Sequence, residues 1–146
     1  MLSDYLSNER IQVCDRLDDW QHAIALAGEP LLREGVITRR YINEIIAEHH
    51  RTGPYYVLAP GVAMPHSRPE NGSLGIGLSL LIVKEGVAFG SDGNDPVRVI
   101  FLLAAKDADS HISLISSLAE LLDDEDNIAQ LSGGDPAILQ SLISRY

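Results

Sequence analysis

Two long aliphatic runs constrain the fold of this chain more strongly than any other feature of its sequence. Residues 75–83 read GIGLSLLIV and residues 97–105 read VRVIFLLAA. A strand with one face in water would alternate polar and apolar side chains, whereas near-continuous apolar runs are typical of central strands that are covered on both faces. The two runs therefore predict a sheet that lies between two layers of helices.

Periodic segments before the runs predict the first helices. Apolar residues recur at helical spacing over residues 20–31, and Asp18 or Asp19 is placed as the N-cap. Thr38 opens a second helical segment, which a following Gly-Pro dipeptide ends. Shorter extended pieces are expected at residues 11–13, 57–59, 62–64 and 86–89.

The last third of the chain is predicted to be helical. Ser110 is placed to cap a helix. The residues that we expect on the core side of this helix are Ile112, Ile115, Leu118, Ala119 and Leu122. The acidic run at 123–126 marks a break and a new helix start, and Asp135 with the following proline opens a last helix. Interleaved helices and strands, with no repeat or linker, predict a single α/β domain over residues 1–146 with helices on both sheet faces.

Charge and composition exclude several classes of function. Eleven basic and twenty-one acidic residues give a formal net charge of −10, which argues against nucleic acid and against an anionic membrane surface as partners. The single cysteine, Cys14, has no internal disulfide partner. The N-terminus has no signal-peptide pattern, and the apolar runs are too short to span a bilayer. We therefore expect a cytoplasmic protein.

His66 is the histidine whose sequence context points most clearly to chemistry. It lies in LAPGVAMPHSRPE, where two prolines and a glycine precede it and a third proline follows. Such a segment is stiff and cannot continue a helix, so it presents its polar side chain at the end of a strand. A structural loop histidine is the alternative interpretation of the same pattern.

His111 is the second informative histidine. It follows the strand predicted at 97–105 and falls in the first turn of the helix that Ser110 is expected to cap. Ligand sites of open α/β sheets gather at the carboxyl ends of strands, and a helix N-terminus suits an anion. The same helix dipole disfavours an imidazolium, so we expect a neutral imidazole that donates a hydrogen bond. A surface position in the first turn is an equally simple interpretation.

The other histidines give weaker signals. His22 lies on an amphipathic segment, which indicates the surface. His49 and His50 are adjacent, so in a helix their side chains point about 100° apart and do not easily face one metal. Ordinary surface or rim positions are the favoured interpretation for both. We predict no metal site and no cofactor.

The stretch GPYYVLAPGVAMPHSRPE, residues 53–70, resembles the active-site segment of phosphotransferase-system enzyme IIA domains of the mannitol–fructose type. Within that family it is most similar to the stand-alone ascorbate-type branch, in which GPY, APG and PHxRPE occur together. Residues 107–131 resemble the second histidine segment of the family and the helices after it. DWQHAIALAGEPLLREGVITRRYINEII matches the opening two helices of the family in pattern, so the resemblance covers nearly the whole chain.

The resemblance implies a specific activity. His66 would accept a phosphoryl group from the carrier HPr as a tele-phosphohistidine intermediate, and would pass it to a cysteine of a cognate enzyme IIB. The membrane enzyme IIC would couple this transfer to uptake of a sugar such as ascorbate. His111 would help to hold the phosphate. The resemblance also implies a mixed sheet of about five strands with helices on both faces.

One departure from the family concerns its arginine late in the second helix, where this chain reads AEHHR. We expect Arg68, two residues from His66, to contact the phosphate, with Arg51 or His50 as alternatives and Ser110 at the helix start as a further contact.

Two other functions are compatible with the same residues. The first is a regulatory, nitrogen-type enzyme IIA that is phosphorylated on the same histidine and acts in signalling. The second is a metal-dependent hydrolase that would use Asp107, Asp109, His111 and His66, although their spacing matches no known metal motif.

Overall fold

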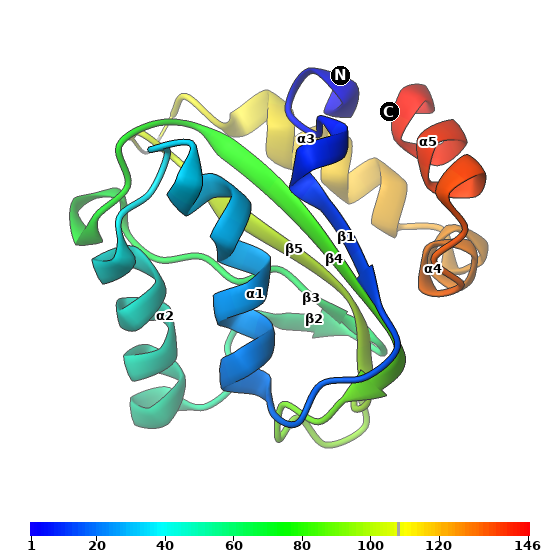
Figure 1. Ribbon diagram of the computed structural model, residues 1–146, viewed down its shortest axis with the longest axis horizontal. Helices are drawn as coiled ribbons and strands as arrows, with labels where there is room; N and C mark the ends of the chain where they lie inside the picture. Colours follow the sequence, from blue (N-terminus) through cyan, green and yellow to red (C-terminus); the bar gives the residue numbers. More distant parts are fainter. Residues whose placement is uncertain (108) are drawn as a thin grey trace.

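The computed structural model describes residues 1–107 and 109–146. A five-stranded mixed sheet lies at its centre, in the order β1-β4-β5-β3-β2. Figure 1 shows helices packed on both faces of this sheet, as the sequence predicts. The strands are β1 (Ile11–Cys14), β2 (Val57–Ala59), β3 (Val62–Ala63), β4 (Gly77–Val87) and β5 (Val97–Ala104).

The two aliphatic runs form the central antiparallel pair, β4 and β5. Every residue of β4 from Gly77 to Val83 is buried, and so is every residue of β5 except Arg98. Strand β4 continues through Val87, so the separate short strand expected at residues 86–89 was wrong. In this continuation Lys84 and Glu85 are exposed, whereas Val87 is buried again.

One face of the sheet is covered by α1 (Trp20–Arg33) and α2 (Arg39–Thr52). The Asp19 carboxylate accepts a hydrogen bond from the backbone of His22 at 2.8 Å, which identifies Asp19 as the N-cap of α1. Helix α2 ends at Gly53, whose φ of 89° lies in the region that favours glycine. Thr38 precedes the helix as predicted.

The other face is covered by α3 (Ile112–Leu122), α4 (Glu125–Ser132) and α5 (Pro136–Arg145). Asp124 and Asp135 cap the last two helices. The predicted inner face of α3 was partly wrong, because Ile112 and Ala119 are exposed and the fully buried residues are Leu114, Leu118 and Leu121. The face of α3 that packs on the core is therefore adjacent to the predicted one.

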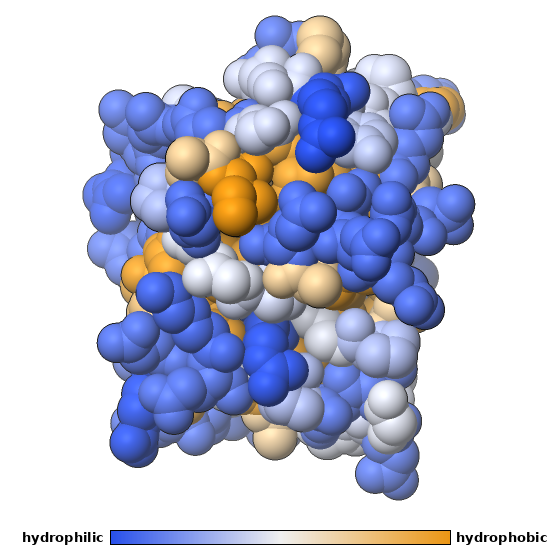
Figure 2. All heavy atoms as spheres, turned by 90° about the vertical axis from the view of Figure 1, so that its right-hand side faces the viewer, coloured by the Kyte–Doolittle hydropathy of each residue, from blue (hydrophilic) through white to orange (hydrophobic). Residues whose placement is uncertain are grey.

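Figure 2 shows the molecule from the side on which α4, α5 and β1 lie, and most of this face is hydrophilic. Val13 of β1 and Ile138 of α5 are among the exposed large hydrophobic residues. In the part of the chain that the structure describes, no helix is long and apolar enough to cross a membrane.

The topology places the loops that follow β3 and β5 at the same edge of the sheet. These strands are parallel neighbours, with Val62 opposite Val99 and Ala63 opposite Ile100. The backbone N–H of Leu103 donates to the carbonyl of Pro65 at 3.0 Å, which extends the contact beyond β3. Because the carboxyl ends of parallel strands coincide, the segments that carry His66 and His111 are brought together.

Candidate active site

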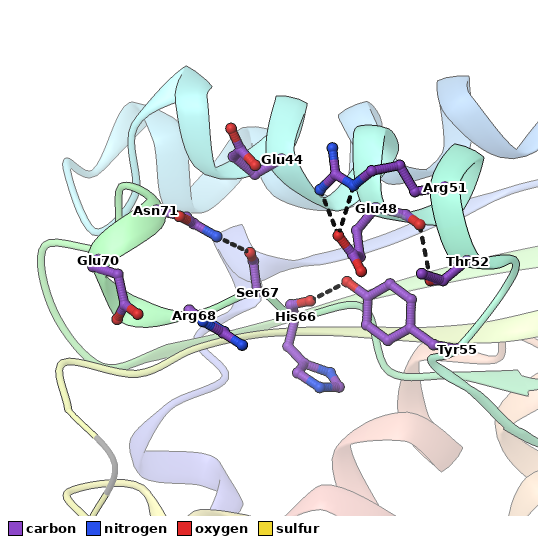
Figure 3. A pocket seen from close by; sticks show the side chains of 10 residues that line it. All are labelled: Glu44, Glu48, Arg51, Thr52, Tyr55, His66, Ser67, Arg68, Glu70 and Asn71. Carbon is purple, nitrogen blue, oxygen red and sulfur yellow. Dashed lines mark hydrogen bonds and ion pairs between the residues drawn. The ribbon is translucent and has the colours of Figure 1, made fainter.

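A depression with a volume of about 720 Å³ lies beside His66, between the end of β3 and helix α2. Most of the side chains around it are polar or charged. Figure 3 shows its ten lining residues, which are Glu44, Glu48, Arg51, Thr52, Tyr55, His66, Ser67, Arg68, Glu70 and Asn71.

His66 is half-buried, and a backbone hydrogen bond fixes its imidazole ring. The ring nitrogen Nδ1 lies 2.8 Å from the carbonyl oxygen of Met64. A carbonyl oxygen can only accept, so Nδ1 carries the proton and donates it. The neutral ring then keeps its lone pair on Nε2, which makes Nε2 the nucleophilic atom of this side chain.

His111 lines a second, smaller cavity of about 80 Å³ together with His66. The other lining residues are Tyr41, Ser67, Pro69, Leu103, Ala105 and Asp107. The Nδ1 atom of His111 is buried and has no hydrogen-bond partner among the described residues. Buried polar atoms are rarely left unpaired, so this nitrogen is an unsatisfied polar group on a residue that lines the cavity.

The start of α3 differs from the expected cap. His111 itself is the N-cap residue, and Ser110 precedes it, so the assignment of Ser110 as cap and of His111 to the first turn was wrong. The Asp107 carboxylate accepts hydrogen bonds from the backbone N–H groups of Ser110 at 2.7 Å and of Asp109 at 3.0 Å. These bonds lower the pKa of Asp107 and occupy the Ser110 N–H. Ala108, in the middle of this expected loop, lies outside the described residues.

Three basic residues were expected near the phosphate, and only two of them, Arg68 and Arg51, line the depression. Arg68 is exposed and lines the depression with His66. Arg51 also lines it, but forms an ion pair with Glu48. In the view of Figure 3 the His66 imidazole points away from the helix that carries Arg51. His50 does not line this depression; its Nε2 lies 3.2 Å from Nε2 of Gln21 on α1.

His49 is a core residue, which corrects the surface or rim position expected for it. It is 8% exposed and stacks on Trp20 with ring centroids 3.7 Å apart. Its Nδ1 lies 2.7 Å from the hydroxyl of Tyr56. Burial lowers the pKa of His49 because it penalises the charged imidazolium.

Sequence reasoning gave no role to the tyrosines beside His66. Tyr41 of α2 and Tyr55 before β2 both reach the segment that carries His66. Burial raises the pKa of each to about 12, so both hydroxyls stay protonated near neutral pH. The only signal in the sequence was the GPYY motif, which contains Tyr55. Tyr41 resembles any other residue on the apolar face of a helix.

His66 and His111 thus line one small cavity at the carboxyl edge of an α/β sheet. Comparison with known proteins then gives the family. Residues 4–146 match the family described as "Phosphoenolpyruvate-dependent sugar phosphotransferase system, EIIA 2". The chain belongs to this family, whose named members are phosphotransferase components.

Two curated relatives illustrate the similarity. The chain is 44% identical over 146 residues to the mannitol-specific cryptic phosphotransferase enzyme IIA component of Escherichia coli K12, covering 99% of this chain and 98% of the relative. It is 37% identical over 125 residues to the ascorbate-specific EIIA component of the same strain, covering 85% and 81%.

Solved structures share the fold. The solution structure of the mannitol-specific cryptic enzyme IIA of E. coli superimposes with a TM-score of 0.90 at 44% identity, covering 99% of each chain. The complex of the E. coli mannitol enzyme IIA with phosphorylated enzyme IIB contains a chain that matches with a TM-score of 0.81 at 28% identity, covering 96% of this chain and 97% of that one.

Proposed function

We propose that this protein is a phosphocarrier that accepts a phosphoryl group from HPr on Nε2 of His66 and transfers it to a cysteine of an enzyme IIB. The observation that carries the proposal is the arrangement of His66, whose Nδ1 is committed to the Met64 carbonyl at 2.8 Å, in a cavity shared with His111. Of the two ring nitrogens of His66, only Nε2 is thereby left free to react.

The two transfers follow from that arrangement. In the first, the Nε2 lone pair attacks phosphorus in line with the donor's nitrogen–phosphorus bond, which breaks and returns its electron pair to the donor imidazole. In the second, a cysteine thiolate attacks the same phosphorus, and the bond to Nε2 breaks. Nδ1 keeps its proton and its bond to Met64 throughout, so the ring stays oriented for both partners.

The surrounding groups stabilise the charge of the phosphoryl group. His111, whose Nδ1 has no partner among the described residues, is placed to donate to a phosphate oxygen. Arg68 lines the larger depression beside His66 and supplies a cation. Arg51 is the second choice because Glu48 already neutralises it. Ser110 is a weaker contact than expected, since its N–H is bonded to Asp107, and His50 is the weakest because it lies beside Gln21.

For the transported substrate we infer a mannitol-type polyol, because the mannitol-specific cryptic relative is 44% identical over nearly the whole chain. Ascorbate is the second candidate, supported by the 37% identical ascorbate-specific relative. The membrane enzyme IIC would couple transfer to uptake. A regulatory enzyme IIA would be phosphorylated in the same way but would not pass the group to an enzyme IIB.

Reconstitution with purified enzyme I, HPr and phosphoenolpyruvate tests the proposal. We expect one labelled phosphohistidine per chain, located on His66, and discharge of the label by a mannitol-type enzyme IIB faster than by an ascorbate-type one. Absence of label would overturn the phosphocarrier function. Stable label that no enzyme IIB discharges would favour the regulatory function instead.

A further inference from the structure

The peptide bond between His66 and Ser67 is held on both sides by tyrosine hydroxyls. The hydroxyl of Tyr55 lies 2.5 Å from the carbonyl oxygen of His66, and the hydroxyl of Tyr41 lies 3.0 Å from the backbone nitrogen of Ser67. That carbonyl and that N–H belong to one planar peptide unit. We call the two tyrosines together the tyrosine clamp.

The chemistry of the groups fixes the direction of each hydrogen bond. A carbonyl only accepts, so Tyr55 donates to His66; a backbone N–H only donates, so Tyr41 accepts from Ser67. The single hydroxyl proton of Tyr41 is therefore free for another acceptor. The carbonyl of Leu103 at 2.7 Å is closer than that of Ser67 at 3.2 Å, so it receives this proton.

Tyr41 thus connects two structural segments that meet only in the folded protein. Leu103 lies near the end of β5, the strand that leads to His111, whereas Ser67 follows His66. Tyr41 also lines the small cavity that His66 and His111 share. Its ring is fully buried, so its hydroxyl is held at a fixed position from which it can set the distance between the two loops.

The clamp complements the bond that orients the imidazole. A planar peptide that is hydrogen-bonded at both its carbonyl and its N–H cannot rotate about its neighbouring bonds without losing one of the bonds. This fixes the direction in which the Cα–Cβ bond of His66 leaves the backbone. The Nδ1 bond to Met64 then fixes the ring itself. Phosphoryl transfer depends on in-line placement of the nucleophile, so rotation of this peptide would move Nε2 off the line of attack.

We propose that Tyr41 and Tyr55 are positioning residues for phosphoryl transfer, which act by clamping the His66–Ser67 peptide so that Nε2 of His66 keeps one orientation. This inference rests on the proposed function of His66 as the phosphoryl acceptor. Neither hydroxyl needs to touch the phosphoryl group for the clamp to act.

Tyrosine-to-phenylalanine variants provide the test, and the chain offers a matched control. Tyr41→Phe and Tyr55→Phe each remove one side of the clamp and keep the ring. Tyr56→Phe removes a buried hydroxyl that is bonded to His49 at 2.7 Å and not to the His66–Ser67 peptide. The control therefore loses a comparable hydrogen bond in the same fold without changing the His66 peptide.

Two measurements are made on each variant. The first is the single-turnover rate of phosphoryl transfer from phosphorylated HPr, which we expect to fall by about 10- to 100-fold in Tyr41→Phe and Tyr55→Phe, and by less than about twofold in Tyr56→Phe. The second is the tautomer of the His66 ring in the unphosphorylated protein, measured by ¹⁵N NMR. We expect protonation of Nδ1 alone in the wild type and the control, and a mixture of tautomers in the two clamp variants.

Rates within about twofold of wild type in both clamp variants would overturn the proposal. So would slower transfer with an unchanged His66 tautomer, because the hydroxyls would then act on the partner rather than through His66. If Tyr41→Phe does not fold, Tyr55→Phe still provides the test, because Tyr55 is half-exposed whereas Tyr41 is buried. Absence of phosphorylation in the wild type would overturn the proposed function, whereas the tautomer measurement, which needs no phosphoryl donor, would still decide whether the clamp orients His66.

Discussion

The loops that follow β3 and β5 end at the same edge of the sheet but hold their histidines in different ways. After β3, the His66 ring is bonded to Met64 and its backbone to two tyrosines. After β5, His111 begins a helix, and its buried Nδ1 has no partner among the described residues. The first loop holds its histidine ring in one orientation, whereas the second leaves a buried polar atom without a partner among the described residues.

The difference between these loops agrees with the different tasks that we propose for the two histidines. A nucleophile must have one defined free nitrogen, because the wrong tautomer places the proton on the reacting atom. A residue that holds the phosphate needs an unused hydrogen-bonding atom at the place where the charge develops.

His66→Gln should abolish phosphorylation by HPr while leaving the fold intact, because it removes the nitrogen that we propose as the nucleophile. Circular dichroism checks the fold, and labelling with ³²P-phosphoenolpyruvate, enzyme I and HPr measures the phosphoryl group. His22→Gln, at an exposed histidine of α1, is the control and should label like wild type. A fully labelled His66→Gln would assign the phosphoryl group to another residue.

His111→Ala should still accept the phosphoryl group on His66 but should pass it on about 100-fold more slowly, the typical cost of removing one donor from a developing charge. Rapid-quench measurements of loading from HPr and of discharge to enzyme IIB separate the two steps. Replacement of the exposed His22 by alanine provides the control. Normal discharge by His111→Ala would show that the two histidines do not act together, despite their shared cavity.

Arg68→Ala should slow transfer by about tenfold, or about 1.4 kcal/mol, because it removes one charged hydrogen bond to the phosphate. Arg51→Ala is the matched comparison from the same depression, and its effect should be smaller because Glu48 already pairs with Arg51. Single-turnover rates for both variants rank the two cations. A larger effect in Arg51→Ala would show that Arg51 leaves Glu48 and contacts the phosphate.

The smallest effect concerns His49, which contrasts with both histidines of the site because it is packed in the core. Burial lowers its pKa in the folded protein, so in mild acid the unfolded chain takes up a proton that the folded chain does not. Stability is then complete above the pKa of the unfolded chain and falls as the pH drops from that value toward the folded pKa.

Urea unfolding between pH 8 and pH 5 measures this dependence. The wild type and His50→Gln should lose stability on acidification, and His49→Gln should lose less over the same interval, although it is less stable at every pH because it gives up the stacking on Trp20. An identical pH dependence in all three proteins would show that His49 does not titrate differently in the folded state.

Patterns along the chain were sufficient to predict much of the architecture. The runs at 75–83 and 97–105 predicted the central strands because burial on both faces leaves few polar positions, here only Ser79 and Arg98. The caps at Asp19 and Asp135 were predictable because they depend on contacts within three residues. The PH segment around His66 indicated the family, which the comparison confirms, and predicted His66 as the nucleophile.

The sequence by itself determined the layered fold, the family and the histidine that we expect to react, because each depends on local pattern or on a contiguous motif. Only the tertiary structure decided which side chains surround that histidine. Tyr41 and Leu103 are 62 residues apart, yet they share a hydrogen bond beside His66. His49 and His50 are adjacent in sequence, yet the first is in the core and the second is exposed. Such partners are brought together by strand order and helix orientation, and no local pattern in the chain encodes them.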